Sequence, residues 1–186
     1  KVLYKINNNE LIKIQFQRLK KIKSNKKIFF LIPKKNNQDL KKFLIQNKIN
    51  FFQGDEHNVL SRYFNAAKNL KAKKIIRLTG DCPLIDFRLI DRLIKTFELS
   101  NSDYMSNTIK RSFPHGMDME IFTFKTLEKI NYLAKTQYDR EHVTSYLTKN
   151  QNSFLIKNFT KLKRESKFRI TVDYKEDFTV IKNIVN

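Results

Sequence analysis

The spacing of apolar residues switches repeatedly between the 3.6-residue period of a helix and short continuous runs typical of buried strands. Three such runs, at 27–32, 50–53 and 74–78, are separated by stretches with helical spacing. This alternation predicts an α/β fold with a largely parallel sheet. The expected helices, counted from their capping residues where there are any, are 11–22, 37–46, 58–70, 86–97, 125–134, 139–148 and 175–184, and the remaining expected strands are 103–106, 119–123, 154–157 and 168–172.

Polar residues that can cap a helix stand before three of these segments. Asn37, Asn58 and Asp86 each come directly before apolar residues at helical spacing. A side-chain oxygen at this position can accept a hydrogen bond from a free N–H of the first helical turn. We therefore expect helices to begin after each of the three.

Length and composition limit the class of protein. The 186 residues contain no apolar run of about 18 residues, the length that a membrane-spanning helix needs. Cys82 is the one cysteine, which excludes an intrachain disulfide framework and a cysteine-cluster zinc site. We expect one domain over residues 1–186, located in the cytoplasm and without a membrane partner.

Charge adds little to this picture. The chain has 38 Lys and Arg against 18 Asp and Glu, for a formal net charge of +20. A surplus of this size is typical of nucleic-acid-binding proteins. It is uneven, however: residues 1–50 carry +12 and residues 51–120 carry +2. Because no nucleic-acid-binding motif accompanies the charge, we predict no nucleic-acid partner.

Two aspartates follow predicted strands, at the edge of a parallel sheet where ligands bind. Asp81 follows strand 74–78 after Gly80, and Asp173 follows strand 168–172. Carboxylates from different strands can share one Mg²⁺ that also holds substrate phosphates. Each has a structural alternative. Asp81 can be a turn residue, and Asp173 can form a capping box with Glu176 at the start of a helix.

Two further groups of polar residues could contact a substrate. Asp118 and Glu120 are two positions apart, so both side chains share one face of the strand that they lead into. They can accept hydrogen bonds from sugar hydroxyls or pair with nearby lysines. Arg140 and His142 belong to one predicted helical turn. They can be structural or can face a phosphate or carboxylate.

Six motifs in one order carry a resemblance to a known family. Together they closely resemble the cytidylyltransferases of the spore coat polysaccharide biosynthesis protein F type, which are related to the 3-deoxy-manno-octulosonate and acylneuraminate cytidylyltransferases. The resemblance covers essentially the whole chain. The motifs are Gly-Asp-Glu-x-x-Val-Leu-x-Arg-Tyr at 54–63, Arg-Leu-Thr-Gly-Asp-Cys-Pro-Leu-Ile-Asp at 77–86, Asp-Tyr-x-Ser-Asn at 103–107, Phe-Pro-x-Gly-Met-Asp-Met-Glu at 113–120, Arg-Glu-His-Val-Thr at 140–144 and Thr-Val-Asp-x-x-Glu-Asp-Phe at 171–178.

The resemblance implies a three-layer α/β/α nucleotidyltransferase, Rossmann-like, on a mostly parallel mixed sheet. It implies that CMP is transferred from CTP to an acidic sugar, for surface polysaccharide or flagellar glycan, with release of pyrophosphate. The cofactor would be Mg²⁺, and a homodimer is compatible with the family. The residues that match the family's sites are Asp81 and Asp173 for metal and catalysis, Gly54, Asp55, Arg62, Arg77 and Gly80 for the nucleotide, and Asp118, Glu120, Arg140 and His142 for the sugar.

The sequence departs from the family pattern in two places. The family opens with a core strand and a triphosphate-binding loop that ends in a lysine. Here Lys1 stands in the place of that lysine, which would give it a catalytic role. We therefore expect a fragment that lacks the first strand and the phosphate loop. His57 and Asn58 stand where the family has an acidic residue. The alternative function is an inactive relative that holds a nucleotide or a polyanion without catalysis.

Overall fold

The strands of the computed structural model, which describes residues 1–162 and 165–185, form three groups. β1 (Lys5–Ile6) and β2 (Asn9–Glu10) form a small antiparallel hairpin. β3 (Phe30–Pro33) and β4 (Phe51–Gly54) pair in parallel. The main sheet has the order β5-β7-β6-β8, with β5 at Lys74–Arg77, β6 at Tyr104–Ser106, β7 at Glu120–Thr123 and β8 at Ile156–Asn158.

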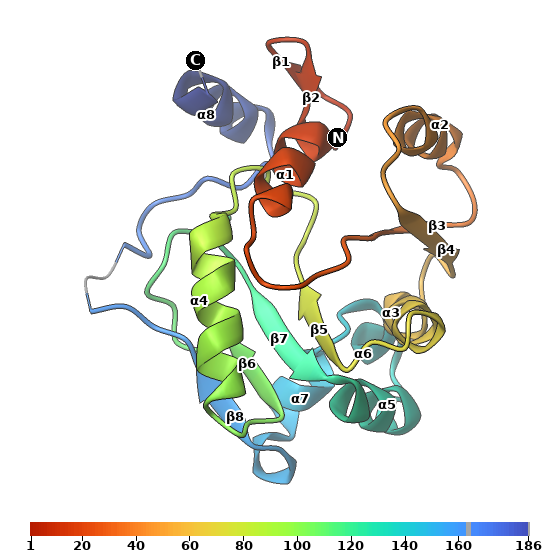
Figure 1. The fold of residues 1–186 in the computed structure, drawn as a ribbon, viewed down its shortest axis with the longest axis vertical. Coiled ribbons are helices and arrows are strands. Elements are labelled where there is room, and N and C mark those ends of the chain that lie inside the picture. Colours follow the sequence, from red (N-terminus) through yellow and green to blue (C-terminus); the bar gives the residue numbers. More distant parts are fainter. Residues whose placement is uncertain (163–164, 186) are drawn as a thin grey trace.

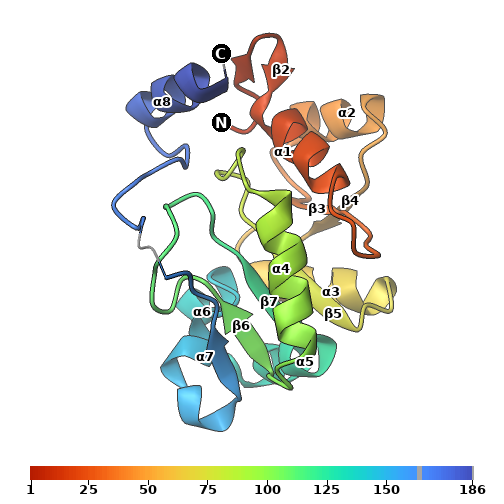
Figure 2. The same ribbon diagram turned by 60° about the vertical axis from the view of Figure 1, so that its left-hand side comes forward.

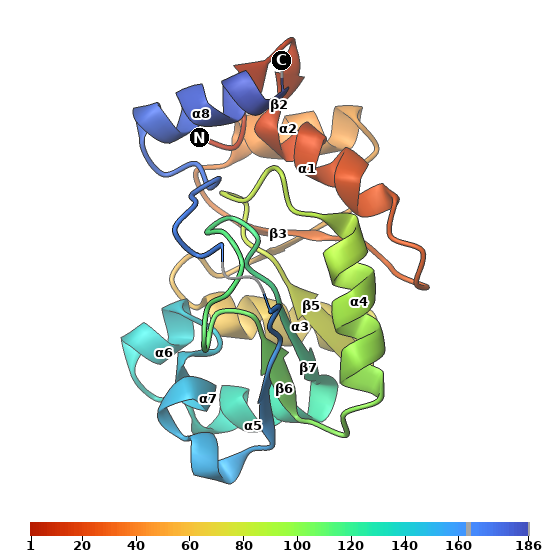
Figure 3. The ribbon, with the colours of Figure 1, turned by 90° about the vertical axis from the view of Figure 1, so that its left-hand side faces the viewer.

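Helices cover both faces of the main sheet, which gives three layers (Figures 1 and 3). On one face lies α4, and on the other lie α3 and α5. The helices are α1 (Leu11–Lys20), α2 (Gln38–Gln46), α3 (Val59–Asn69), α4 (Phe87–Glu98), α5 (Phe124–Leu133), α6 (Gln137–Glu141), α7 (Ser145–Lys149) and α8 (Lys175–Val185), with a short 3₁₀ turn at Gln151–Ser153. The expected α/β fold is confirmed.

Alternation along the central strands divides the core in two. Ile121 of β7 and Met105 of β6 pack on one side with α4 and the end of α1. Phe122 follows Ile121 and Tyr104 precedes Met105, and these two neighbouring residues pack on the opposite side of the sheet with α3 and α5. Successive side chains of a strand point to opposite faces, so a strand covered on both sides must be apolar at every position. This explains the short continuous apolar runs in the sequence.

Within the described residues, the main sheet is mixed and mostly parallel, as expected, with β7 the one reversed strand among its four. β7 runs antiparallel to both β5 and β6, whereas β6 and β8 are parallel. No helix lies in the segment between β6 and β7. A chain that returns without a helical crossover pairs antiparallel. The parallel β3–β4 pair is not joined to this sheet in the described part of the chain.

Three expected elements differ in the structure. The strand expected at 27–32 begins at Phe30, because its partner β4 has only four residues with which it can pair. Segment 168–172 is not a strand. It forms a single parallel bridge between Arg169 and His115, and no strand of the described residues lies beside it to extend this bridge into a ladder. The helix expected at 139–148 is divided into α6 and α7 at Val143, which has a φ of 52°.

Two of the three expected helix caps are formed. Asn58 Oδ1 accepts a hydrogen bond from Ser61 N at 3.0 Å, and Asp86 Oδ1 accepts one from Arg88 N at 2.9 Å. Asn37 occupies the expected position before α2, but its side chain makes no cap hydrogen bond. α8 packs beside the β1–β2 hairpin through Ile6 and Ile181 (Figure 2). No helix of the described residues is long and apolar enough to cross a bilayer.

Candidate active site

The structure brings Asp81 and Asp173 together through Thr171. Thr171 Oγ1 lies 3.2 Å from Asp81 Oδ2 and 3.5 Å from Asp173 Oδ2. The same hydroxyl is 3.0 Å from the backbone carbonyl of Asp81, and Val172 N donates to that carbonyl at 2.8 Å. The two carboxylates therefore meet across one buried threonine, at the point where β5 leads into its turn.

Gln15 of α1 holds the turn that follows β5 through two hydrogen bonds. Its Nε2 donates hydrogen bonds to the carbonyl of Thr79 at 2.8 Å and to that of Cys82 at 3.0 Å. The side chain is buried, so both bonds are shielded from water. Sequence reasoning missed this residue. Its one signal was an amide on the otherwise apolar face of helix 11–22.

Two cations already hold Asp173. Lys1 Nζ lies 2.9 Å from Asp173 Oδ1, and Arg169 Nη2 lies 2.7 Å from Oδ2. The hydrogen bond from Lys1 lowers the pKa of Asp173 despite partial burial, and Arg169 adds to this effect. The carboxylate is therefore ionised at neutral pH, the state in which it can bind a metal ion. Lys1 thus lies beside Asp173, one of the two candidate metal ligands.

Asp177 takes the hydrogen bonds expected of a capping box. Its Oδ2 accepts from Asp173 N at 2.8 Å and from Tyr174 N at 3.1 Å. Arg169 binds both of its oxygens, at 2.9 and 3.0 Å. The Asp173 side chain is thereby left to face Lys1, Arg169 and Thr171 instead of capping α8. The alternative, a capping box formed by Asp173 and Glu176, is therefore wrong, because Asp177 makes these hydrogen bonds.

A Mg²⁺ ion fits the donor set at this edge. Among residues 1–162 and 165–185, no group of three or more His, Cys, Asp or Glu side chains could hold a metal ion on its own. Mg²⁺ is usually bound by one or two carboxylates together with substrate phosphates and water, not by a complete protein cage. Asp81 and Asp173 would supply the two carboxylates, and a bound nucleotide would supply the phosphates.

Glu120 lies in a buried hydrogen-bond cluster. Its carboxylate pairs with Arg77 of β5 and accepts from Tyr104 Oη and Thr144 Oγ1, each at 2.6 Å. Burial raises the pKa of Tyr104, and the neighbouring Glu120 carboxylate raises it further, so the phenol stays a donor. Both carboxylate oxygens are thus occupied by protein groups. This cluster connects β5, β6 and β7 with the start of α7.

Asp118 also pairs with an arginine. Both of its oxygens receive hydrogen bonds from the guanidinium of Arg111. The alternative that Asp118 and Glu120 pair with basic side chains is therefore confirmed in kind, although the partners are arginines and not lysines. Asp118 is partly exposed, whereas Glu120 is buried.

Arg140 and His142 lie at the end of α6. Arg140 Nη1 donates to Asn131 Oδ1 at 3.0 Å, and the exposed His142 ring lies 4.2 Å from the Tyr138 ring, centroid to centroid. In the described part of the chain, neither residue forms a hydrogen bond or an ion pair with Asp81 or Asp173. Only Thr144, two residues after His142, reaches the Glu120 cluster.

The candidate nucleotide loop at the end of β4 is tightly packed. A Cβ added to Gly54 would lie 2.7 Å from Arg62 Cγ, so this glycine leaves room for the buried arginine. Arg62 Nη1 donates to the Asp55 carbonyl at 3.2 Å. Asp55 Oδ1 accepts from Asn58 N and His57 N, which lowers its pKa. Gly54, Asp55 and Arg62 thus form one local unit.

Gly116 holds the segment that carries Thr171 and Asp173. Its φ is +97°, and a Cβ there would lie 2.6 Å from the backbone of Ile170. We expect Gly116→Ala to lower the free energy of unfolding by more than about 1 kcal/mol, because the new methyl group meets rigid backbone at a strained φ. Urea denaturation measures this change.

Gly80→Ala is the matched control for that substitution. An added Cβ at Gly80 meets only Val2 Cγ1 at 3.3 Å, and no left-handed backbone is required. We expect this variant to stay within about 0.5 kcal/mol of the parent chain. Equal loss of stability in the two variants would contradict the proposed close approach of Gly116 to Ile170.

Asp139 gives the α6–α7 corner a dependence on pH. Burial alone would raise its pKa, but hydrogen bonds from Lys149, Ser145 and Thr136 outweigh this and lower it to about 2. Because the folded-state pKa lies below the unfolded one, the stabilisation is complete above about pH 4 and is lost as the pH falls towards 2. We expect this loss to be about 2 kcal/mol.

Comparison with Asp139→Asn isolates this contribution from that of the other carboxylates. The free energy of unfolding of both chains, measured in urea between pH 6 and 2.5, should converge at the acid end. If the two pH profiles stay parallel, Asp139 does not carry the effect.

The chain is similar to known proteins over nearly its whole length. A family model described as cytidylyltransferase matches residues 1–185. An uncharacterised protein of Methanocaldococcus jannaschii is 36% identical over 182 residues, which cover 96% of this chain and 73% of that protein. The spore coat polysaccharide biosynthesis protein SpsF of Bacillus subtilis is 29% identical over 191 residues, covering 98% and 78%.

A solved structure has the same fold. The structure of a cytidylyltransferase from Leptospira borgpetersenii superposes with a TM-score of 0.95 at 30% identity, covering 100% of this chain and 79% of that one. The three-layer arrangement described above is therefore shared with that protein.

Proposed function

The chain belongs to the cytidylyltransferase family, and from this we propose that it transfers CMP from CTP to an acidic sugar in a Mg²⁺-dependent reaction that releases pyrophosphate. The observation that carries the proposal is the pair Asp81 and Asp173, which meet across Thr171 at the edge of the sheet. Two carboxylates at this place suit a cation that binds a triphosphate. The name of the Bacillus subtilis relative supports a product used in surface polysaccharide.

In this reaction the sugar hydroxyl attacks the α-phosphorus of CTP. The new bond joins the sugar oxygen to phosphorus, the hydroxyl proton is released to water, and the bond from that phosphorus to the bridging oxygen breaks, so pyrophosphate leaves. Mg²⁺ bound by Asp81 and Asp173 would neutralise charge on the phosphates. Lys1 and Arg169 lie on the same carboxylate and would pair with phosphate oxygens of a bound nucleotide.

The roles of the remaining residues are part of the proposal. We assign Gly54, Asp55 and Arg62 to the nucleotide, since they form one local unit at the carboxyl end of β4. Gly80, directly before Asp81, keeps its assignment to the nucleotide. Asp118 and Arg140 are partly exposed and remain candidates for the sugar. His142 stays a prediction for the same role.

Glu120 and Arg77 have a different role in this proposal. Each is engaged with the other inside the protein, so they position β5 and β7 and do not contact substrate directly. Glu120 would therefore affect the sugar site, and Arg77 the nucleotide site, only through the positions of these strands.

Calorimetry tests the nucleotide and the metal separately from catalysis. We expect CTP to bind in the presence of Mg²⁺ and to lose most of its affinity when EDTA removes the ion, with UTP and ATP as matched controls. Pyrophosphate release from CTP is then measured with a panel of acidic and neutral sugars. CTP binding that is indifferent to Mg²⁺, or no discrimination among nucleotides, would refute the proposal.

The same measurements address a binding-only relative. The surplus of +12 in residues 1–50 favours this alternative. It predicts binding of any polyanion with an affinity that falls steeply with salt, and no pyrophosphate release. Mg²⁺-dependent selectivity for CTP at physiological salt would exclude it.

A further inference from the structure

The turn that carries Asp81 is only weakly held by its own hydrogen bonds. It lies between β5 and α4, outside both elements. Within the turn, Cys82 N donates to Thr79 O at 3.3 Å, and Ile85 N donates to Cys82 O at 3.4 Å. Both distances exceed the mode of about 2.9–3.0 Å for N–H···O bonds in proteins. A fixed direction of the Asp81 carboxylate therefore requires restraints from outside the turn.

One restraint comes from the segment that leads to Asp173. Val172 N donates to Asp81 O at 2.8 Å, and Thr171 Oγ1 donates to the same carbonyl at 3.0 Å. These two bonds hold the main chain at Asp81 itself. They leave the residues on either side of it unrestrained.

α1 supplies the missing restraints through one of its faces. Gln15 Nε2 donates to Thr79 O at 2.8 Å and to Cys82 O at 3.0 Å, so one amide group holds the turn on both sides of the candidate metal ligand. Arg18 Nε donates to Ile85 O at 2.8 Å. Residues three apart on a helix are neighbours on its surface, and the three acceptors are likewise three apart along the turn. The two side chains together therefore hold the whole turn.

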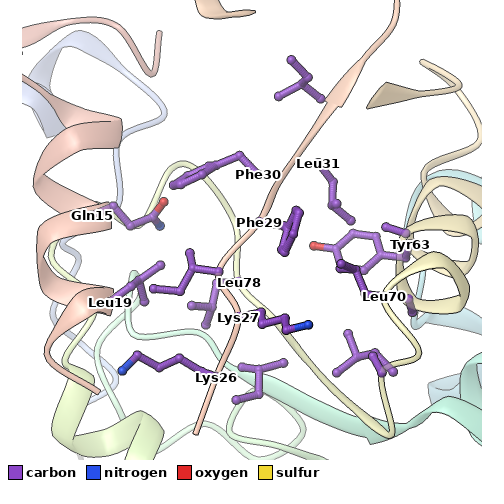
Figure 4. A pocket seen from close by; sticks show the side chains of 18 of the residues that line it. Gln15, Leu19, Lys26, Lys27, Phe29, Phe30, Leu31, Tyr63, Leu70 and Leu78 are labelled. Carbon is purple, nitrogen blue, oxygen red and sulfur yellow. The ribbon is translucent and has the colours of Figure 1, made fainter. Parts of the chain in front are cut away.

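The surroundings of Gln15 make these bonds effective restraints. Gln15 lies on the apolar face of α1 with Ile12 and Leu19, and it is 3% exposed. Together with Leu19 and Leu78 it borders an apolar cavity of about 340 Å³ (Figure 4). An amide buried among apolar groups costs free energy unless its donors are bonded. Hydrogen bonds are also electrostatically stronger in such surroundings than in water.

We propose that Gln15 is a positioning residue of the metal site, which fixes the turn so that the Asp81 carboxylate points towards Thr171 and the cation. The inference rests on the proposed function, in which Asp81 binds Mg²⁺. Gln15 acts through the backbone of the turn and does not contact the cation. Residues that orient metal ligands change metal affinity about 10- to 100-fold when they are replaced.

Gln15→Met tests the proposal on the 186-residue chain, because methionine is also unbranched and long but has no strong donor. CTP binding is measured by calorimetry over a series of Mg²⁺ concentrations. We expect the Mg²⁺ concentration that gives half-maximal CTP binding to rise at least about tenfold. At saturating Mg²⁺ the affinity for CTP should return to that of the parent chain. Gln17→Met is the matched control, because Gln17 is exposed on the same helix, and it should leave the Mg²⁺ midpoint unchanged.

A second measurement needs neither metal nor nucleotide. Hydrogen exchange is followed at the amide of Cys82 in the turn, with the amide of Leu93 in the middle of α4 as internal control. We expect Gln15→Met to speed exchange at Cys82 at least about tenfold and to leave Leu93 at the parent rate, because only the turn opens. Gln15→Asn keeps the amide but shortens the side chain by one methylene group. It should shift both readouts in the same direction, and it replaces the methionine variant if that one does not fold.

The outcomes distinguish this inference from the proposed function. A general structural role of Gln15 would speed exchange at Leu93 and lower the number of CTP sites per chain without moving the Mg²⁺ midpoint, and that result would overturn the inference. An unchanged midpoint beside a Mg²⁺-dependent parent chain would overturn it as well. A parent chain whose CTP binding ignores Mg²⁺ would refute the proposed function, and the inference with it.

Discussion

Asp81→Asn and Asp173→Asn should each weaken Mg²⁺-dependent CTP binding about 100-fold or more, and pyrophosphate release should fall with it. Loss of a residue that only supports the ligands of a metal ion lowers metal affinity about 10- to 100-fold, so loss of a ligand itself should have a larger effect. The two aspartates meet across Thr171 Oγ1 at 3.2 and 3.5 Å. Calorimetric titration of CTP at fixed Mg²⁺ measures the change.

Glu128→Gln is the matched control for these variants. Glu128 is an exposed carboxylate on α5, among the helices on the far face of the sheet, and its removal changes the net charge by the same amount (Figure 1). It should leave CTP affinity unchanged. Thr171→Val removes only the bridging hydroxyl and should give an intermediate loss. Full activity in Asp81→Asn would rule out the metal role of this carboxylate.

Glu120→Ala should lower the free energy of unfolding by about 3–5 kcal/mol, which is a large part of the stability of a domain of this size. The substitution leaves the largely buried Arg77 guanidinium without its counter-charge and removes the acceptor of Tyr104 and Thr144. An uncompensated buried charge accounts for most of the cost. Urea denaturation followed by circular dichroism measures it.

A double substitution distinguishes the cost of an unpaired charge from the cost of losing the whole hydrogen-bond cluster. Arg77→Met with Glu120→Leu removes both charges and fills the space with apolar groups, which is often nearly neutral for a buried ion pair. We expect the double variant to be more stable than Glu120→Ala alone. Additive losses would show that the two side chains do not depend on each other.

The sequence predicts the elements that depend on local signals. Asn58 and Asp86 cap α3 and α4 because a side-chain acceptor before an amphipathic segment is a sufficient signal. The strand-end rule indicated Asp81, which follows the turn after β5, and Asp173, although the segment before Asp173 forms a single bridge instead of the expected strand. Their meeting through Thr171 could not be predicted, because it depends on a contact between residues 90 positions apart.

Other features have no local signal at all. The break at Val143 places a β-branched residue at a positive φ, which its own side chain disfavours, so only the surrounding packing accounts for it. The partners of Glu120 follow from the strand order β5-β7-β6, which alternation of apolar residues does not encode. Segment 168–172 has the composition of a strand but lacks a neighbour with which to form one.

The contacts at the two carboxylates also bear on the order in which the molecule folds. Thr171 and Asp81 are 90 residues apart, and Lys1 and Asp173 are 172 apart, whereas the hydrogen bonds of Glu120 span 16, 24 and 43 residues. Closing longer loops costs more chain entropy. We therefore expect the sheet around Glu120 to form before the carboxylate edge closes. Because that edge is held by a single bridge instead of a ladder, we also expect it to open while the sheet stays folded.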